Sequence, residues 1–115
     1  PTFQNGWGNY PAGSEDDKKK YAVRYAKDIT GTVYVEGAIS GGSIGFGIPA
    51  FTLPEGYRPG RNFQWTGVAS QVGMQGVPQY HRLFVNTDGE VIIENCSNKV
   101  YPNEYIALGF SFKAR

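Results

Sequence analysis

The chain of 115 residues is poor in the residues that build metal sites and disulfides, with one cysteine, Cys96, and one histidine, His81. A single cysteine excludes a disulfide within the chain, and one residue of each kind cannot supply the ligands of a zinc site. No apolar run approaches the roughly 20 residues of a transmembrane helix, and no signal peptide is visible. We therefore expect no metal, no cofactor and no membrane insertion.

An excess of one charge is also missing, because the formal net charge is only +1. The one basic cluster, at positions 18–20, directly follows three acidic residues at positions 15–17, so their fields largely cancel. Nothing resembles the basic stripe with which proteins follow the phosphates of a nucleic acid. We expect no binding to nucleic acid.

Helix-forming residues are scarce, with one methionine and few leucines, whereas 16 glycines and 15% aromatic residues are present. Glycine costs about 1 kcal/mol in the interior of a helix, and aromatic side chains lose rotamer freedom there. The composition therefore favours strands joined by tight turns. A chain of this length forms one domain. Because it starts at Pro1 without an initiator methionine, we expect it to be part of a longer protein.

The first twenty residues have no regular period, and we expect an N-terminal arm over 1–20. Ser14, with Asp17 three residues later, is a pattern that caps a short helix, and the lysines that follow suit its C-terminal end. A plain loop is the alternative. Trp7 and Tyr10 are the apolar residues of the arm, and we expect them to pack across a sheet edge rather than to face a ligand.

Alternation of apolar and polar residues predicts strands along the rest of the chain. The predicted strands cover 21–28, 32–40, 62–72, 79–87, 90–94 and 105–114, with a glycine-loosened segment at 43–50. Gly31 closes a first hairpin, Asp88-Gly89 closes a second, and Gly67 indicates a bulge or bend. About seven short strands separated by turns indicate an all-β fold, an antiparallel β-sandwich of jelly-roll type over residues 21–115.

The stretch FTLPEGYRPGR, at 51–61, places two prolines and two glycines between predicted strands. Its first part fits a type I turn that ends at Gly56, and its second part fits the start of a type II turn with positive φ at Gly60. Two such corners carry a chain from one sheet to the other, with Leu53 and Tyr57 filling the crossover. We interpret the stretch as a structural corner and not a catalytic loop, built from Leu53, Pro54, Gly56, Tyr57, Arg58, Pro59 and Gly60.

No arrangement of residues for catalysis is visible. His81 lies in an extended segment without a nucleophile motif, and we interpret it as a surface or interface histidine. The run SGGSIGFG, at 40–47, lacks the lysine and the following helix of a phosphate-binding loop. The few acidic residues lie at turns, so paired carboxylates for glycoside hydrolysis are unsupported. We do not expect an enzyme.

Carbohydrate binding needs flat aromatic faces for the sugar ring, together with amide and guanidinium groups for its hydroxyl or phosphate groups. Two segments offer this mixture, around Trp65 and around Tyr80. The alternative is that both aromatic residues belong to the core or to a subunit interface. The candidate ligand-binding residues are Asn62, Gln64, Trp65, Gln79, Tyr80, His81 and Arg82.

Apolar side chains occur on both faces of several predicted strands, as with Tyr34 beside Val33 and Val35, and with Val68 opposite Trp65. A sandwich of this size has one internal face per sheet, so part of this apolar surface would stay exposed. A symmetric contact between copies of the chain would cover it. The pattern therefore favours an oligomer.

An ordered set of segments runs through nearly the whole chain: PT-QNGW, VRYAKDITGTVYVEGAISGG, FTLPEGYRPG, VNTDGEV and LGFSF. Together they resemble the C-terminal tip domain of bacteriophage tail fibres, tail appendages and receptor-binding proteins, which also caps some tailspike depolymerases. The most specific part is the LPxGYRP corner at 53–59, which follows the Gly41-Gly42 pair.

This resemblance implies a homotrimeric β-sandwich knob on the virion tail, attached to upstream tail fibre or appendage domains. It implies action outside the cell, by binding a host cell-wall glycan such as wall teichoic acid, and a framework role for the corner. Because ligand residues vary between members of the family, it assigns no binding residue by position. A trimerisation or folding cap without a ligand of its own is the alternative, and a hydrolase of wall polymers is a third hypothesis.

Overall fold

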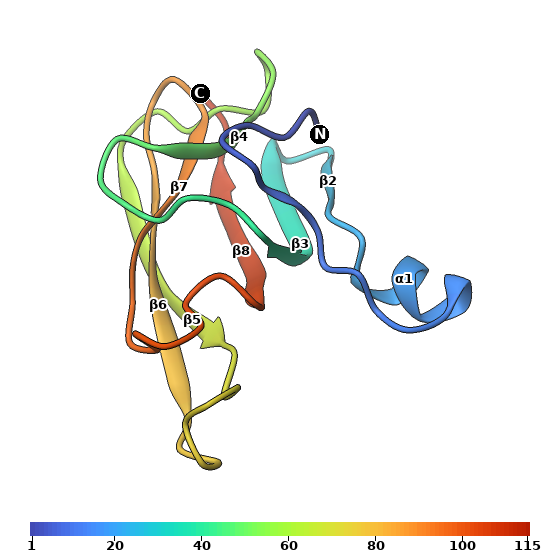
Figure 1. Ribbon diagram of the computed structural model, residues 1–115. Coiled ribbons are helices and arrows are strands. Elements are labelled where there is room, and N and C mark those ends of the chain that lie inside the picture. The colour runs from blue at the N-terminus through green and yellow to red at the C-terminus, as the bar shows by residue number, and fades with distance from the viewer.

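The computed structural model describes residues 1–115 as one antiparallel sheet of eight strands that curls on itself, with a short helix at its side (Figure 1). The strands are joined in the order β1-β3-β8-β5-β6-β7-β4, and β2 pairs with β3 on the edge that β1 also uses. The elements are β1 (Gly8–Asn9), α1 (Glu15–Tyr21), β2 (Arg24–Lys27), β3 (Thr32–Ser40), β4 (Pro49–Thr52), β5 (Phe63–Ala69), β6 (Gln79–Val85), β7 (Glu90–Cys96) and β8 (Ile106–Lys113).

One hydrophobic core joins the two ends of this sheet. Val33 of β3 and Phe110 of β8 belong to the same buried cluster as Leu83 of β6 and Val91 of β7. The two halves of the curled sheet therefore face each other across the core like the layers of a sandwich. The prediction of an all-β, antiparallel, sandwich-like fold is confirmed. The alternation predicted for the last strand is also confirmed, because its buried residues are Ile106, Leu108, Phe110 and Phe112.

The ladder between β5 and β8 is the shortest in the sheet. Only Ala69 and Ile106 are paired across it. Beyond this pair, β5 and β8 contact each other through side chains. The rings of Trp65 and Phe110 lie with their centroids 4.6 Å apart. The inner side of Trp65 thus belongs to the core packing, which was the alternative interpretation of this residue.

The arm folds as the helical alternative predicted. Ser14 caps α1, since its hydroxyl accepts a hydrogen bond from the Asp17 N–H at 3.1 Å. The prediction of a strand from residue 21 is wrong at its start, because Tyr21 ends the helix and β2 begins at Arg24. Tyr21 instead packs edge-to-face on Tyr10, with ring centroids 5.4 Å apart. No helix is long and apolar enough to cross a membrane.

Trp7 anchors the arm to the sheet. Its side chain is buried in the core, and its Nε1 donates a hydrogen bond to the Ser43 carbonyl at 3.0 Å. A Cβ on Gly42 would lie 2.1 Å from the indole, so this position must be glycine for the ring to pack there. The expectation that Trp7 packs on the sheet is confirmed, whereas Tyr10 packs edge-to-face on Tyr21 of α1 and on Tyr105, with ring centroids 5.4 Å and 4.9 Å away.

Both predicted hairpins form. The β2–β3 turn has φ +86° at Gly31. The Asp28 carboxylate accepts hydrogen bonds from the Thr30 hydroxyl and from the Thr32 N–H, which hold the pKa of this group below its ordinary value. The β6–β7 turn has φ +80° at Gly89, and the Asn86 side chain accepts from two backbone N–H groups of the turn. Pro49 starts β4, an edge strand, which is where a proline is tolerated.

The corner after β4 differs from the prediction in its first turn. The Tyr57 N–H donates to the Pro54 carbonyl at 3.1 Å, and Gly56 has φ +88°. The turn therefore starts one residue later than expected, with positive φ at its third position as in a type II turn. The reason lies at Leu53, whose carbonyl accepts a hydrogen bond from Arg58 Nε at 2.8 Å and does not close a turn.

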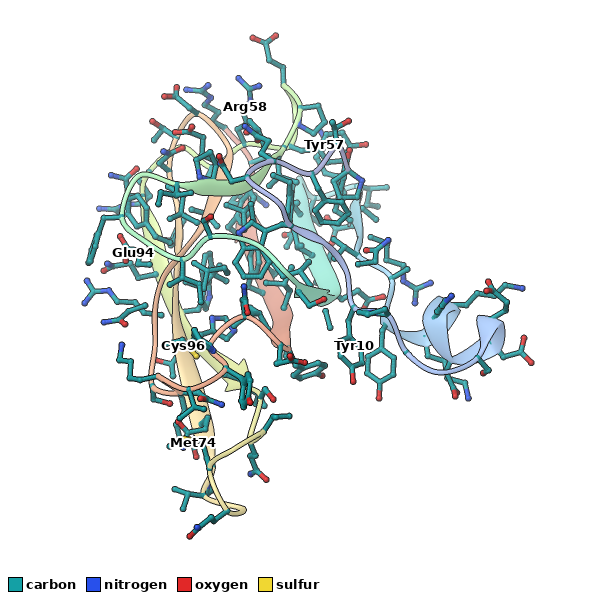
Figure 2. All side chains as sticks on the ribbon, viewed as in Figure 1. Tyr10, Tyr57, Arg58, Met74, Glu94 and Cys96 are labelled. Carbon is teal, nitrogen blue, oxygen red and sulfur yellow. The ribbon has the colours of Figure 1, made fainter.

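The second predicted turn of the corner is wrong. Gly60 does not adopt positive φ, and Pro59 instead forms a bridge with Ala114. Beside this bridge, the Arg115 N–H donates to the Arg58 carbonyl at 3.0 Å. The corner therefore holds the C-terminal end of the chain, and Figure 2 shows Tyr57 and Arg58 together at this end of the molecule. Leu53 and Tyr57 pack on the core, as expected of the crossover.

Apolar side chains do remain on the surface. Tyr34 is 51% exposed and Val68 is 56% exposed, as the two-faced strand pattern predicted. A further group lies on the loops 70–78 and 97–105, which hydrogen bonds from the Asn98 side chain tie together. We call this group the apolar tip, and its exposed residues are Val72, Val77, Val100 and Tyr101.

Candidate functional site

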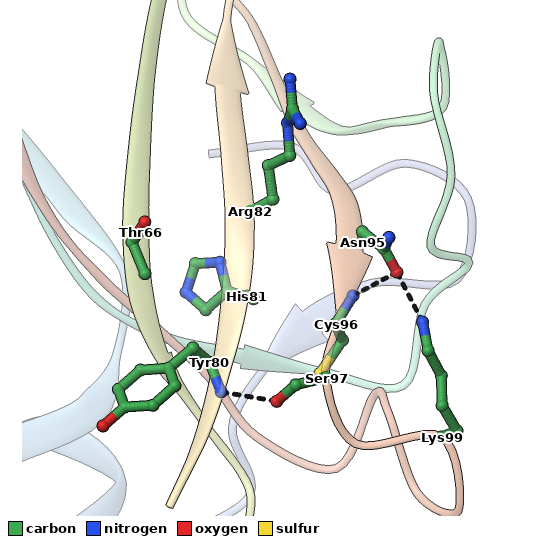
Figure 3. A pocket seen from close by; sticks show the side chains of 8 residues that line it. All are labelled: Thr66, Tyr80, His81, Arg82, Asn95, Cys96, Ser97 and Lys99. Carbon is green, nitrogen blue, oxygen red and sulfur yellow. Dashed lines mark hydrogen bonds between the residues drawn. The ribbon is translucent and has the colours of Figure 1, made fainter.

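The outer face of the sheet carries a groove across β5, β6 and β7 (Figure 3). Strand alternation creates it, because Tyr80 and Arg82 of β6 point outward while the residues between and beside them are buried. The groove encloses about 430 Å³. It is lined by Thr66, Tyr80, His81, Arg82, Asn95, Cys96, Ser97 and Lys99.

Tyr80 forms one wall of the groove, and its side chain is 52% exposed. Two hydrogen bonds fix its backbone to the end of β7. The Tyr80 N–H donates to Ser97 Oγ at 2.8 Å, and the Ser97 N–H donates to the Tyr80 carbonyl at 2.9 Å. The aromatic ring thus stands on a rigid backbone with much of its surface open to solvent.

Asn95 and Lys99 form the opposite wall. The Asn95 Oδ1 atom accepts hydrogen bonds from Lys99 Nζ at 2.6 Å and from the Cys96 N–H at 2.9 Å (Figure 3). These contacts orient the amide and leave its nitrogen without a partner in the chain. Lys99 has no carboxylate within ion-pair distance.

Arg82 lies at the centre of the outer face and is held from two sides. Its Nε donates to Glu94 Oε1 at 2.9 Å, and its guanidinium carbon lies 5.8 Å from the centroid of the Phe46 ring. Glu94 reaches this position because β7 has a bulge, so that Arg82 pairs with Asn95 while Leu83 pairs with Ile93. Arg82 and Thr66 also line a second hollow of about 340 Å³ together with Gln64 and Trp65.

His81 does not lie on the surface, and the interpretation as a surface or interface histidine is wrong. Its side chain is 2% exposed and points inward, across β5 toward β8. Nε2 donates to the Ala107 carbonyl at 2.7 Å, which places the proton on Nε2 and leaves Nδ1 buried without a partner. Burial lowers the pKa of the imidazole, while the hydrogen bond to Ala107 opposes this shift.

Gly67 explains how the ring reaches β8. It pairs with His81 in the β5–β6 ladder without a register shift, so the predicted bulge at this position is wrong. A Cβ on Gly67 would lie 2.2 Å from His81 Nε2. A glycine at this position therefore leaves the room that the imidazole needs to pass over the strand.

The structure separates the sequence-predicted candidates into two groups. Gln64, Tyr80 and Arg82 lie exposed on the outer face, and Trp65 borders the second hollow. His81 and Gln79 are buried, and Gln79 accepts a hydrogen bond from Ser97 Oγ at 2.7 Å.

Asn62 stands apart from the groove. Its Oδ1 accepts from the Thr87 N–H at 3.3 Å, so this side chain connects the start of β5 to the β6–β7 turn. Its role in the described contacts is structural.

Sequence reasoning missed five of the eight residues that line the groove. Strand alternation from Gln64 would have placed Thr66 on the same face of β5. The residues from β7 and the loop after it could be found only from the pairing of β6 with β7. The bulge changes which residues of β7 face outward, and no sequence pattern announces it. The missed lining residues are Thr66, Asn95, Cys96, Ser97 and Lys99, and Phe46 and Glu94, which hold Arg82, were missed as well.

The arrangement is suited to binding. An aromatic ring, hydroxyl groups, one amide group and two cations face one groove, and none of the residues that line either hollow is acidic. Cys96 is buried at 3% exposure, opposite His81 in the ladder, so its thiol is not presented to solvent. No group of three or more histidine, cysteine, aspartate or glutamate residues is arranged to hold a metal ion.

Comparisons of the chain with protein-family models, with curated proteins and with solved structures find no match.

Proposed function

We propose that the chain is the tip domain of a bacteriophage tail protein, and that it binds a polysaccharide on the host cell surface for adsorption. The observation that carries the proposal is the outer groove, in which the exposed ring of Tyr80 stands among hydrogen-bonding side chains on a rigid sheet. A sugar ring offers an apolar C–H face to an aromatic side chain and hydroxyl groups to amides and cations. The sandwich-like fold supports the proposal, because the resemblance of the sequence implies such a knob.

Binding without cleavage is the activity that the groove favours. Hydrolysis of a glycoside needs two carboxyl groups on either side of the scissile bond. The lining of the groove offers none, and Glu94, which lies beside the groove, is engaged in the hydrogen bond with Arg82. Binding of a polysaccharide without cleavage therefore needs only the side chains that are present in the groove.

A shallow groove of this kind gives weak single-site affinity, so we propose that the domain acts as a homotrimer at the end of tail fibre or appendage domains on the virion tail. Linked sites exceed the affinity of one site by roughly 10²–10⁴ when they engage one surface together. The apolar tip supports an interface between copies, because its valines and Tyr101 are about half exposed in the single chain.

The proposal is tested by cosedimentation of the protein with purified walls from a panel of Gram-positive bacteria. Walls are compared before and after hydrofluoric acid treatment, which removes teichoic acid. Retention on intact walls alone identifies a wall polymer held through phosphodiester bonds, such as teichoic acid, as the receptor, and retention on both identifies another wall glycan. Negligible retention on every wall, intact or stripped, would end the proposal.

A trimerisation cap without a ligand is the second candidate, and the apolar tip is the observation that favours it. A compact terminal domain protects the open strand edges of a fibre. The two functions differ in what deletion of the domain does to its parent protein. A truncated parent that still forms trimers but no longer adsorbs to cells would reject the cap and support receptor binding.

A further inference from the structure

We infer that Arg82 forms an oxyanion subsite, so that the groove selects glycans that carry phosphate or carboxylate groups over neutral ones; this inference rests on the proposed function. The guanidinium group offers five donors in a planar fork. Only Nε is used within the chain, in the hydrogen bond to Glu94. Both terminal nitrogens of Arg82 are without a partner, and the side chain is 55% exposed.

Two contacts hold the guanidinium group of Arg82 in a fixed orientation, so the proposed subsite is preorganised. Glu94 is 7% exposed and fixes the Nε edge, while the Phe46 ring lies on the guanidinium. A bond at Nε turns the opposite edge of the fork, with its two terminal nitrogens, away from Glu94. An oxyanion with two oxygen atoms can then accept two parallel hydrogen bonds from a group whose orientation is already set.

The charge of the groove agrees with this assignment. Arg82 and Lys99 are its two cations, and no acidic residue lines it. Glu94 is the one carboxylate in contact with either cation, and it is largely covered. With Glu94 paired to Arg82, the groove keeps one cation that has no carboxylate partner, Lys99, and no acidic residue among those that line it.

The position of Arg82 also fits a linear polymer. It lines both hollows of the outer face, the one of about 430 Å³ beside Tyr80 and the one of about 340 Å³ beside Gln64. A chain of sugars or polyols that lies along the two hollows passes the guanidinium between them. Arg82 would therefore read the charged link or substituent between two neutral units.

Calorimetric titration of the protein with three polymers of matched length tests the inference: poly(glycerol phosphate), polygalacturonate and dextran. We expect one or both charged polymers to bind at least tenfold more tightly than dextran, as the difference between charge-assisted and neutral hydrogen bonds requires. Preference for the first identifies phosphate as the ligand group, and preference for the second identifies carboxylate. Equal binding of all three polymers, or binding of none, would overturn the inference.

Variants locate the subsite. Arg82→Lys keeps a cation beside Glu94, so the fold is retained, but it removes the planar fork of donors. We expect about a tenfold loss of affinity for the charged polymer and no loss of affinity for dextran. Arg24→Lys is the matched control, because Arg24 also pairs with a carboxylate, Glu36, but on β2 and β3. Wild-type affinity in Arg82→Lys would overturn the assignment.

Phe46 is a positioning residue in this scheme and is tested separately. Phe46→Leu removes the face on which the guanidinium lies, whereas Phe46→Tyr keeps it. Since Phe46 is 67% exposed, neither change should alter the melting temperature. We expect weaker binding of the charged polymer in Phe46→Leu only. If the polymers show no preference while the protein still sediments with walls, the oxyanion subsite fails and the proposed function stands.

Discussion

The imidazole of His81 occupies the space that a side chain at position 67 would need. Its Nε2 lies 2.2 Å from where a Cβ on Gly67 would stand, and the same nitrogen meets the Ala107 carbonyl at 2.7 Å. The ring thereby connects β6 to β8 across β5, close to Ala69 and Ile106, the one pair that joins β5 to β8. The histidine thus adds a hydrogen bond beside the shortest ladder of the sheet.

Gly67→Ala should therefore destabilise the protein. The new methyl group forces the ring off Ala107 or shifts β5, and overpacking of this kind costs about 1–3 kcal/mol. Chemical denaturation measures the change in the free energy of unfolding. Gly109→Ala is the control, because a Cβ on Gly109 of β8 meets no atom within 4 Å. Equal effects of the two changes would show that His81 does not set the requirement for glycine.

The burial of His81 also predicts how stability depends on pH. An exposed histidine in the unfolded chain has a pKa of about 6.5, and burial lowers the pKa of His81 in the folded state. The unfolded chain then binds the proton at higher pH than the folded chain. The contribution of His81 to stability is complete above pH 6.5 and is lost as the pH falls toward the folded pKa. Unfolding midpoints measured from pH 7.5 down to pH 5.5 should fall.

His81→Gln is the control for this dependence, since the amide can donate to Ala107 and does not titrate. The variant should lose most of the decline in stability between pH 7 and pH 5.5. A decline as steep as that of the unaltered protein would assign the effect to other groups.

Much of the fold was predictable because its signals are local. Gly31 and Asp88-Gly89 mark hairpins that form, and the alternation from Ile106 to Phe112 marks a strand with one buried face. These features depend on neighbours in sequence. The helix of the arm was one of two alternatives, and the Ser14 cap decides it in the folded chain.

The candidate site was harder to predict because it depends on contacts between distant segments. His81 and Tyr80 are adjacent and look alike in a sequence of polar and aromatic residues, yet strand alternation sends one inward and the other outward. Only the pairing of β6 with β5 shows that Gly67 leaves room for the histidine. The Glu94 bulge and the loop that carries Phe46 depend in the same way on tertiary structure.

Tyr80→Ala should weaken retention on cell walls without changing the fold. The ring is 52% exposed, and truncation of an aromatic residue that contacts a ligand costs about 1–2 kcal/mol, or roughly a 5- to 30-fold loss of affinity. Tyr34→Ala is a matched control, because Tyr34 is 51% exposed and lies on β3. Retention of both variants is measured by cosedimentation. Equal losses in the two would mean that the walls do not bind at the groove.

Alanine substitutions at two glycines with positive φ distinguish the cost of backbone strain from the cost of a steric clash. Gly76 has φ +77° and a Cβ there meets nothing within 4 Å, whereas Gly89 has φ +80° and a Cβ there lies 2.8 Å from the Leu53 carbonyl. Gly76→Ala should cost about 1–2 kcal/mol, the penalty of an L-residue in this conformation. Gly89→Ala adds the clash with a backbone atom that cannot move freely, since the Leu53 N–H donates to the Gly89 carbonyl at 2.8 Å.

The total for Gly89→Ala should exceed that for Gly76→Ala by about 1–3 kcal/mol, the typical cost of overpacking. Denaturation midpoints of the two variants, measured side by side, give the difference directly. Arg58→Ala in the Gly89→Ala background removes the Arg58 side chain, whose Cγ lies 2.7 Å from the added Cβ, but not the contact with Leu53. Because Arg58→Ala alone also loses the hydrogen bond from Arg58 Nε to the Leu53 carbonyl, the relief is read as a coupling: the double variant should lose less stability than the sum of Gly89→Ala and Arg58→Ala measured singly. Equal losses in the two single variants would mean that the corner yields to the new methyl group and does not hold the β6–β7 turn rigidly.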